Sequence, residues 1–171
     1  YASSRGVIVV FAAGNDNSGA SYFPGAYSGV IAVAAVNNNL VRASFSNYGR
    51  WVDISAPGVQ VASTSTNNNY VYKSGTSMAC PHVSGMLALG YSANPSATKS
   101  QLINCMYSTA ININGINPSF SNLLGAGSID AYAFLQCVGG GGTPPAPSPK
   151  PTSTTPPTDT CVCDKELYLE L

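Results

Sequence analysis

Charged side chains are scarce in this sequence. Its 171 residues include seven Lys and Arg and seven Asp and Glu, which give a formal net charge of +0. Binding to nucleic acid or to an anionic membrane depends on an excess of basic side chains, so we expect neither partner. The sequence also lacks any apolar run of the ~18 residues that a membrane-spanning helix needs.

Histidine is nearly absent, and the cysteines do not form a zinc-binding pattern. His82 is the single histidine, and Cys161 and Cys163 are too closely spaced for a zinc site. Of the five cysteines, we expect Cys80 to be a free thiol that packs as a small apolar side chain. The chain begins at Tyr1 without Met or a visible signal peptide, which predicts a processed or incomplete amino end.

Several elements can be predicted from the apolar patterns. Continuous apolar, β-branched runs are typical of parallel strands that are covered on both faces. Strands are expected at residues 6–13, 30–36, 51–55 and 70–73, and a helix at 98–108. After a predicted domain at 1–138, residues 139–160 are rich in Gly and then in Pro, Thr and Ser, which indicates a linker. Residues 161–171 are too short for a domain and look like the start of a truncated further module.

The stretch from Gly75 to Gly85 places a serine at the start of a helix. Pro81 is best tolerated in the first helical turn, which puts the helix start near Ser77, and the residues from 78 to 93 are small or apolar on nearly every side. Such a helix is expected to be buried all round. Backbone N–H groups at its start favour negative charge, so Ser77 is suited to chemistry through a transient anion. The structural alternative is that Thr76 or Ser77 is simply the N-cap.

Four segments resemble the subtilisin-like serine proteases, the subtilases. They are Ala12-Ala13-Gly14-Asn15, the residues 43–49 (ASFSNYG), the residues 53–58 (DISAPG), and the nucleophile segment 75–83. The resemblance covers roughly residues 6–136. It implies an α/β fold with three layers, in which a mostly parallel sheet is flanked by helices, incomplete here at its amino end.

The resemblance also implies roles for particular residues. Ser77 would be the nucleophile, and its own N–H and the Asn15 side chain would hold the oxyanion. Taken alone, Asn15 after a strand is as well explained as a turn residue. A substrate-binding role is implied for Ala12, Ala13, Gly14 and Thr76, and residues 16–29 would border the pocket for the substrate side chain before the scissile bond.

The catalytic Asp and His of the family lie upstream of the Asn15 segment, and this chain begins too late to include them. His82 lies five residues after Ser77 and therefore points about 140° away around the helix, so we expect it to be structural. Asp53 does not match the triad acid either. We therefore expect a serine endopeptidase that hydrolyses peptide bonds in polypeptide substrates, whose isolated 171-residue fragment is inactive.

A cation site is also implied by the resemblance. The backbone carbonyls of Gly25, Tyr27 and Val30, together with Asp53, match positions that bind a weak structural cation in some family members. Oxygen ligands suit calcium or a monovalent ion. The alternative is that Asp53 anchors a loop through hydrogen bonds, and no cofactor is required for the chemistry.

Two other functions are compatible with parts of the sequence. A catalytically inactive subtilase-like binding module would keep the fold without turnover, and a wall or matrix protein would explain the Pro-rich region after residue 139. The enzyme is the preferred hypothesis, because Ser77 and Asn15 are both present. We expect it to be a monomer in the secretory pathway or outside the cell.

The cysteine pairing remains open at this stage. Cys105 is on the helix after the central one, and Cys137 ends the last predicted helix, so a bridge between them would tie the final helix down. Alternatively, either is a buried free thiol, or Cys137 pairs with Cys161 or Cys163. Connectivity does not follow from sequence alone.

Overall fold

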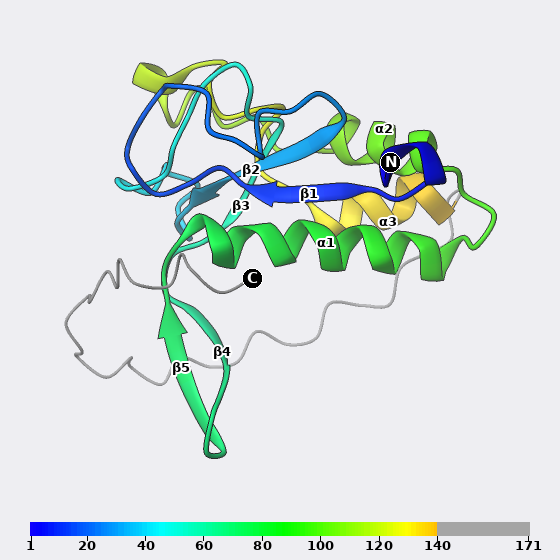
Figure 1. The fold of residues 1–171 in the computed structure, drawn as a ribbon, viewed down its shortest axis with the longest axis horizontal. Coiled ribbons are helices and arrows are strands. Elements are labelled where there is room, and N and C mark those ends of the chain that lie inside the picture. Colours follow the sequence, from blue (N-terminus) through cyan, green and yellow to red (C-terminus); the bar gives the residue numbers. More distant parts are fainter. Residues whose placement is uncertain (140–171) are drawn as a thin grey trace.

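The computed structural model describes residues 1–139 and is built around a three-stranded parallel sheet (Figure 1). Its strands are β1 (Val9–Ala12), β2 (Val30–Val36) and β3 (Ile54–Pro57), in the order β1-β2-β3. The register pairs Val9 with Val30 and Val33 with Ile54. This parallel sheet with flanking helices confirms the α/β fold class expected from the sequence.

The central strand β2 is buried on both faces, as its unbroken apolar sequence predicts. Its residues from 31 to 36 are at most 4% exposed. Ile31, Val33 and Ala35 pack with the helices in the main core, whereas Ala34 and Val36 pack against loop residues in a second, smaller core. The two cores lie on opposite faces because successive side chains of a strand alternate.

Three α-helices accompany the sheet: α1 (Thr76–Ala93), α2 (Lys99–Ser108) and α3 (Ala131–Gly139). The helix predicted at 98–108 is confirmed to within one residue, with Thr98 and Gln101 forming a capping box at its start. Gly90 of α1 is a close-approach position, since a Cβ there would lie 2.7 Å from the Phe134 ring of α3. Short 3-10 turns span Ser3–Arg5 and Pro118–Phe120.

The central helix is not buried all round, so that expectation is wrong for the described residues. The sheet covers one face of α1, where Ala79, Val83 and Met86 are buried. The opposite face is exposed, with Leu89 54% accessible. The edge strand β1 likewise exposes Phe11, although the sequence predicts a strand covered on both faces. A helix or strand that is hydrophobic on every side is expected to be buried, but its composition does not indicate which other elements pack against it.

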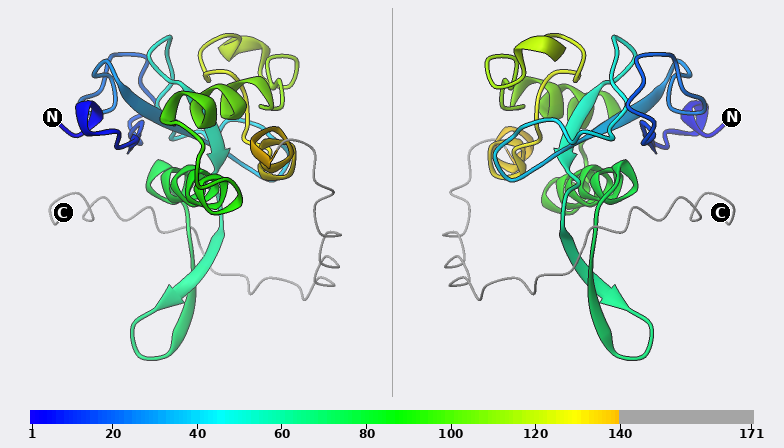
Figure 2. Two further views of the ribbon diagram at one scale, coloured as in Figure 1. Left: turned by 90° about the vertical axis from the view of Figure 1, so that its right-hand side faces the viewer. Right: turned by 90° about the vertical axis from the view of Figure 1, so that its left-hand side faces the viewer.

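Two strand predictions also need correction. β3 begins at Ile54 rather than residue 51, because Val52 still belongs to a turn in which its N–H donates to the Gly49 carbonyl. The predicted strand at 70–73 is β5 (Asn69–Lys73), which pairs with β4 (Val61–Ser65), a strand that the polar sequence did not reveal. This antiparallel hairpin projects away from the sheet (Figures 1 and 2).

Cys105 of α2 and Cys137 of α3 form a disulfide, with their Cα atoms 5.7 Å apart. This confirms the first of the pairings considered and excludes the pairing of Cys137 with Cys161 or Cys163. Cys80 is a free thiol, as expected, and burial raises its pKa. Within residues 1–139, no helix combines the length and hydrophobicity needed to cross a membrane. The predicted linker, apart from residue 139, and the predicted module at 161–171 lie outside the described residues.

We expect the disulfide to stabilise the fold substantially, because it closes a loop with a sequence separation of 32 residues. Replacing both Cys105 and Cys137 by Ala should lower the free energy of unfolding by about 3–4 kcal/mol through the entropy of the unfolded chain. Urea unfolding measures this difference, with Cys80→Ala as the control. Equal midpoints for the native and double-variant proteins would contradict it.

Candidate active site

The site lies where the end of β1 meets the start of α1. Asn15 follows the last residues of β1, and parallel sheets present their ligand sites at this carboxyl edge. Thr76 is the first residue of α1 and is buried. The topology thus brings together two residues that are 61 positions apart in the sequence.

Asn15 is fixed by two hydrogen bonds from Thr76. The Thr76 backbone N–H and its Oγ1 hydroxyl both donate to Asn15 Oδ1, each over 2.9 Å. Thr76 Oγ1 in turn accepts the Gly14 N–H over 3.1 Å. The Asn15 oxygen is thereby occupied within the fold, which orients the side-chain amide with Nδ2 3.5 Å from the point where a Cβ on Gly75 would lie.

These contacts exclude the interpretation of Thr76 or Ser77 as the N-cap of α1. The N-cap is Gly75, and it makes no side-chain capping bond. Asn15 provides the capping oxygen instead, because its Oδ1 accepts the first helical N–H. Ser77 is the second residue of α1 and its side chain is exposed, so it is accessible to a ligand from solvent.

The helix starts one residue earlier than predicted, which puts Pro81 in its second turn. Proline has no N–H, so the Ser77 carbonyl has no backbone donor from the following turn. His82 is exposed, and its Nδ1 bonds to the Met78 carbonyl of its own helix over 2.8 Å. Since a carbonyl only accepts, Nδ1 carries the proton. This contact supports the structural role expected for His82.

The predicted substrate-binding segment is engaged within the fold through its backbone. Ala13 is fully buried, with its N–H bonded to the Val33 carbonyl. The Gly14 N–H donates to Thr76 Oγ1, and the Gly14 carbonyl accepts the Asn47 N–H. Only Ala12 of the three is partly exposed at its side chain. The Ala13 N–H and both backbone groups of Gly14 are therefore paired within the fold.

Asn47 lies next to the candidate site and was not singled out from the sequence. It is fully buried beside the turn that contains Asn15, and its side chain bonds to the Ala13 carbonyl over 2.9 Å and to the Asp16 and Ser18 N–H groups over 3.0 Å. The only signal in the sequence was its place in the segment 43–49. Nothing in the chain's local pattern shows that this segment packs against residues 13–18.

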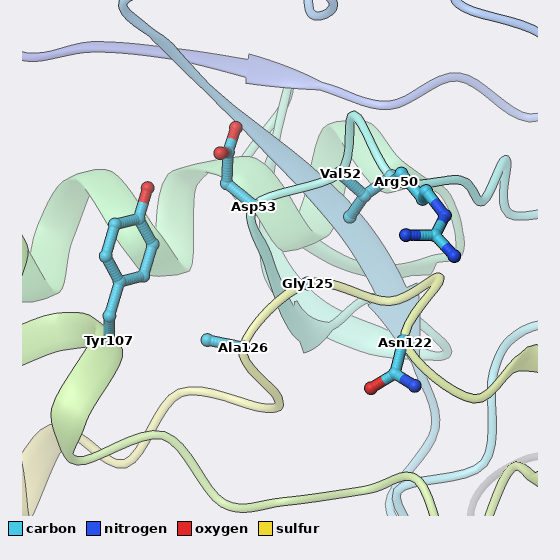
Figure 3. Close-up of a pocket in the computed structure, with 7 residues that line it drawn as sticks. All are labelled: Arg50, Val52, Asp53, Tyr107, Asn122, Gly125 and Ala126. Carbon is cyan, nitrogen blue, oxygen red and sulfur yellow. The ribbon is translucent and has the colours of Figure 1, made fainter.

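Asp53, predicted to be a cation ligand or a loop anchor, is held by hydrogen bonds. Its Oδ2 accepts the Ala32 N–H over 2.8 Å, and the Tyr107 hydroxyl donates to its carboxylate. Asp53 lines a surface cavity of about 390 Å³. The lining residues, drawn in Figure 3, are Arg50, Val52, Asp53, Tyr107, Asn122, Gly125 and Ala126. Partial burial raises the pKa of Asp53, although both hydrogen bonds oppose the shift. Burial and the Asp53 charge raise the pKa of Tyr107 to about 12.

The three carbonyl ligands predicted with Asp53 do not line this cavity. Gly25 is buried, and the Tyr27 carbonyl accepts the Val30 N–H over 3.2 Å. Among residues 1–139, no three acidic, His or Cys side chains are grouped as a metal site. The contacts that the structure does record for Asp53 are those of a loop anchor.

Comparison with known proteins places these residues in a family context. The model of the subtilase family matches residues 1–127. The chain is 56% identical over 89 residues, 52% of its length and 22% of the relative's, to a thermophilic serine proteinase of Bacillus sp. (strain AK1). It is 44% identical over 132 residues to Subtilisin Savinase of Lederbergia lenta, covering 77% of this chain and 47% of the relative.

Solved structures give a consistent result. A protease from Pseudoalteromonas arctica PAMC 21717 superposes with a TM-score of 0.71 at 38% identity, over 79% of this chain and 44% of that protein. The prenylagaramide maturation protease superposes with a TM-score of 0.74 at 25% identity, over 82% of this chain and 53% of that protein. The chain thus spans between about a fifth and about half of the length of these proteins.

The hydroxyl of Thr76 should contribute measurably to stability. Thr76→Val leaves the Gly14 N–H without its acceptor and removes one donor to Asn15, so we expect the free energy of unfolding to fall by about 1–3 kcal/mol. Thr76→Ser keeps the hydroxyl and is the matched control in urea unfolding. Equal losses in the two variants would show that the hydroxyl bonds contribute nothing.

Tyr107 should make stability depend on pH in the alkaline range. Its pKa of about 12 exceeds the ordinary 10.0, so the folded state holds the phenol proton more tightly than the unfolded chain. The resulting stabilisation is present below about pH 10 and is lost as the pH rises toward 12. Urea unfolding at a series of pH values should show a shallower decline for Tyr107→Phe than for the native protein. Identical declines would contradict the assignment.

Proposed function

Because this chain belongs to the subtilase family, we propose that it forms the carboxyl-terminal part of the catalytic domain of a serine endopeptidase. The observation that carries the proposal is the pair of hydrogen bonds from Thr76 to Asn15 Oδ1, one residue before Ser77. A serine peptidase needs a nucleophile with oxyanion donors beside it. The exposed Ser77 and the Asn15 amide, at the junction of β1 and α1, support this assignment.

In this proposal, Ser77 Oγ attacks the carbonyl carbon of the scissile peptide bond. The oxygen that becomes negative accepts hydrogen bonds from the Ser77 backbone N–H and from Asn15 Nδ2. The Ser77 N–H lies in the first turn of α1, where amides lack intrahelical acceptors and the helix dipole favours an anion. In this proposal Asn15 Oδ1 stays bonded to Thr76, and Nδ2, the donor atom of the same amide, donates to the oxyanion.

The general base has to come from outside the residues described. His82 is the single histidine of the sequence, and its Nδ1 is bonded to the Met78 carbonyl on its own helix. Asp53 is paired with Ala32 and Tyr107. We therefore propose that the triad Asp and His are contributed by residues upstream of this chain in the complete protein, and that the chain alone does not turn over peptides.

The proposal extends to substrate, compartment and cation. Polypeptides are the substrate class, and the Cys105–Cys137 disulfide favours an oxidising compartment, outside the cell or in the secretory pathway. A hard cation held by the carbonyls of Gly25, Tyr27 and Val30 is a separate structural proposal. Asp53 would contribute its carboxylate, which also accepts the Ala32 N–H at Oδ2 and is hydrogen-bonded to Tyr107, and no catalytic step depends on this ion.

A subtilase-like binding module without activity is the alternative, and the intact Ser77, Asn15 and Thr76 arrangement argues against it. A protein that only binds has no need for an exposed serine beside a fixed amide at a helix start. The wall or matrix hypothesis rests on the Pro-rich region beyond the described residues.

We expect Ser77→Ala in the complete protein to abolish labelling by a fluorophosphonate and turnover of a peptide substrate. Asn15→Ala should lower kcat by about 10²–10³, the size established in subtilisin for the loss of this type of donor, with little change in KM. Ser84→Ala, on an exposed position of the same helix, is the matched control. Labelling that survives Ser77→Ala, or an effect of Asn15→Ala on KM alone, would contradict the proposed roles.

A further inference from the structure

We propose that Asn47 is a positioning residue for the oxyanion hole, because it fixes the backbone that carries Asn15. The inference rests on the function proposed above and adds a residue to it. Thr76 orients the Asn15 side chain, but the position of the Asn15 donor also depends on the position of the Asn15 Cα atom. In the described residues, Asn47 makes hydrogen bonds to the chain on both sides of Asn15.

The contacts of Asn47 span the turn from Ala13 to Ser18. Before Asn15, Asn47 Nδ2 donates to the Ala13 carbonyl over 2.9 Å, and the Asn47 N–H donates to the Gly14 carbonyl over 2.9 Å. After Asn15, Asn47 Oδ1 accepts the N–H groups of Asp16 and Ser18, each over 3.0 Å. One buried amide thus replaces the hydrogen bonds that a regular strand or helix would provide for this turn.

Gly14 shows how closely the turn fits this side chain. A Cβ on Gly14 would lie 2.5 Å from Asn47 Nδ2, and the φ of Gly14 is +98°, which side chains other than glycine rarely adopt. The turn therefore passes Asn47 with no side chain between them. Such a fit leaves the residue after Gly14 little freedom to shift relative to Asn47.

Asn47 is itself anchored to the sheet through its neighbour. The Ser46 hydroxyl accepts the N–H of Ala35 in β2 over 3.0 Å and donates to the Asn47 carbonyl over 2.9 Å. Arg42 donates to the Ser46 carbonyl and, over 2.8 Å, to Asn17 Oδ1. These bonds thereby fix the position of Asn15 relative to β2, the most completely buried strand.

This anchoring matters for rate rather than for binding. Oxyanion donors act at about 2.7–3.1 Å from the developing charge, so a small displacement of the Asn15 backbone weakens a contact that is strongest in the transition state. A misplacement of about 1 Å in a catalytic arrangement costs about 10²-fold. Loss of the Asn47 contacts should therefore lower kcat and leave KM nearly unchanged.

Asn117 offers a matched control for the experiment. It is also buried, and its side chain accepts the Arg42 N–H and donates to the carbonyls of Leu40 and Ile113, none of them in the turn that carries Asn15. Asn47→Ser and Asn117→Ser in the complete protein each remove a buried amide with three or more hydrogen bonds. Both should lower the melting temperature, whereas only Asn47→Ser should lower kcat.

The measurements are kcat and KM for a peptide substrate, and the rate of fluorophosphonate labelling, in a double-mutant cycle with Asn15→Ala. We expect Asn47→Ser to lower kcat by about 10–100-fold in the native background and by less than about 3-fold when Asn15 is already Ala. Should Asn47→Ser not fold, Asn47→Asp keeps the acceptor for Asp16 and Ser18 and loses the donation to Ala13. It should show the same dependence on Asn15.

Three results would overturn the inference. They are an unchanged kcat in Asn47→Ser despite a lowered melting temperature, an equal loss of kcat in Asn117→Ser, and a loss that is the same with and without Asn15. The proposed function fails separately, since it requires that Asn15→Ala alone reduces kcat. If Asn15→Ala leaves kcat unchanged, both proposals are wrong, and if only Asn47→Ser does so, the oxyanion role of Asn15 stands without Asn47.

Discussion

The site depends on one contact, the close approach of the end of β1 to the start of α1. Asn15 Oδ1 accepts two hydrogen bonds from Thr76, and this joins a strand terminus to a helix terminus. Gly58 allows the helix entry to lie this close to the sheet. The Gly75 N–H donates to the Gly58 carbonyl over 2.8 Å, and a Cβ on Gly58 would lie only 2.8 Å from the Gly75 carbonyl oxygen. A side chain at Gly58 would push α1 away from the sheet and separate Thr76 from Asn15.

Much of the fold could be predicted because its signals are local. The apolar run of β2 and the capping residues of α2 specify their elements within a few positions of sequence. The hairpin of β4 and β5 was only half recognised, because its strand residues are mostly exposed and polar. The exposed face of α1 was missed for a different reason, since composition reports how hydrophobic a helix is and not which elements cover it.

The site residues divide in the same way. Ser77 and Asn15 could be proposed from motifs that resemble a family, and the structure brings their segments together. Asn47 could not be proposed, because its function arises from a buried contact across 31 residues of sequence to Asp16. A buried asparagine has no sequence pattern of its own. Only the three-dimensional arrangement shows that its two amide atoms match the backbone groups of one turn.

The scarcity of charge noted in the sequence has a consequence for the site. Asn15 is held by Thr76 through hydrogen bonds between neutral groups, and most bonds of Asn47 to the turn are of the same kind. The turn also has contacts with charged side chains, since Asn47 Nδ2 donates to Asp16 Oδ2 over 3.4 Å and Arg42 donates to Asn17 Oδ1 over 2.8 Å. Neutral amides and hydroxyls do not titrate in the physiological range, and their hydrogen bonds are not screened by salt as ion pairs are. The two bonds that join Asn15 to α1 therefore do not themselves involve a group that changes its protonation. In an enzyme whose base must change protonation during each cycle, oxyanion donors held by neutral contacts keep their position while the charge beside them changes.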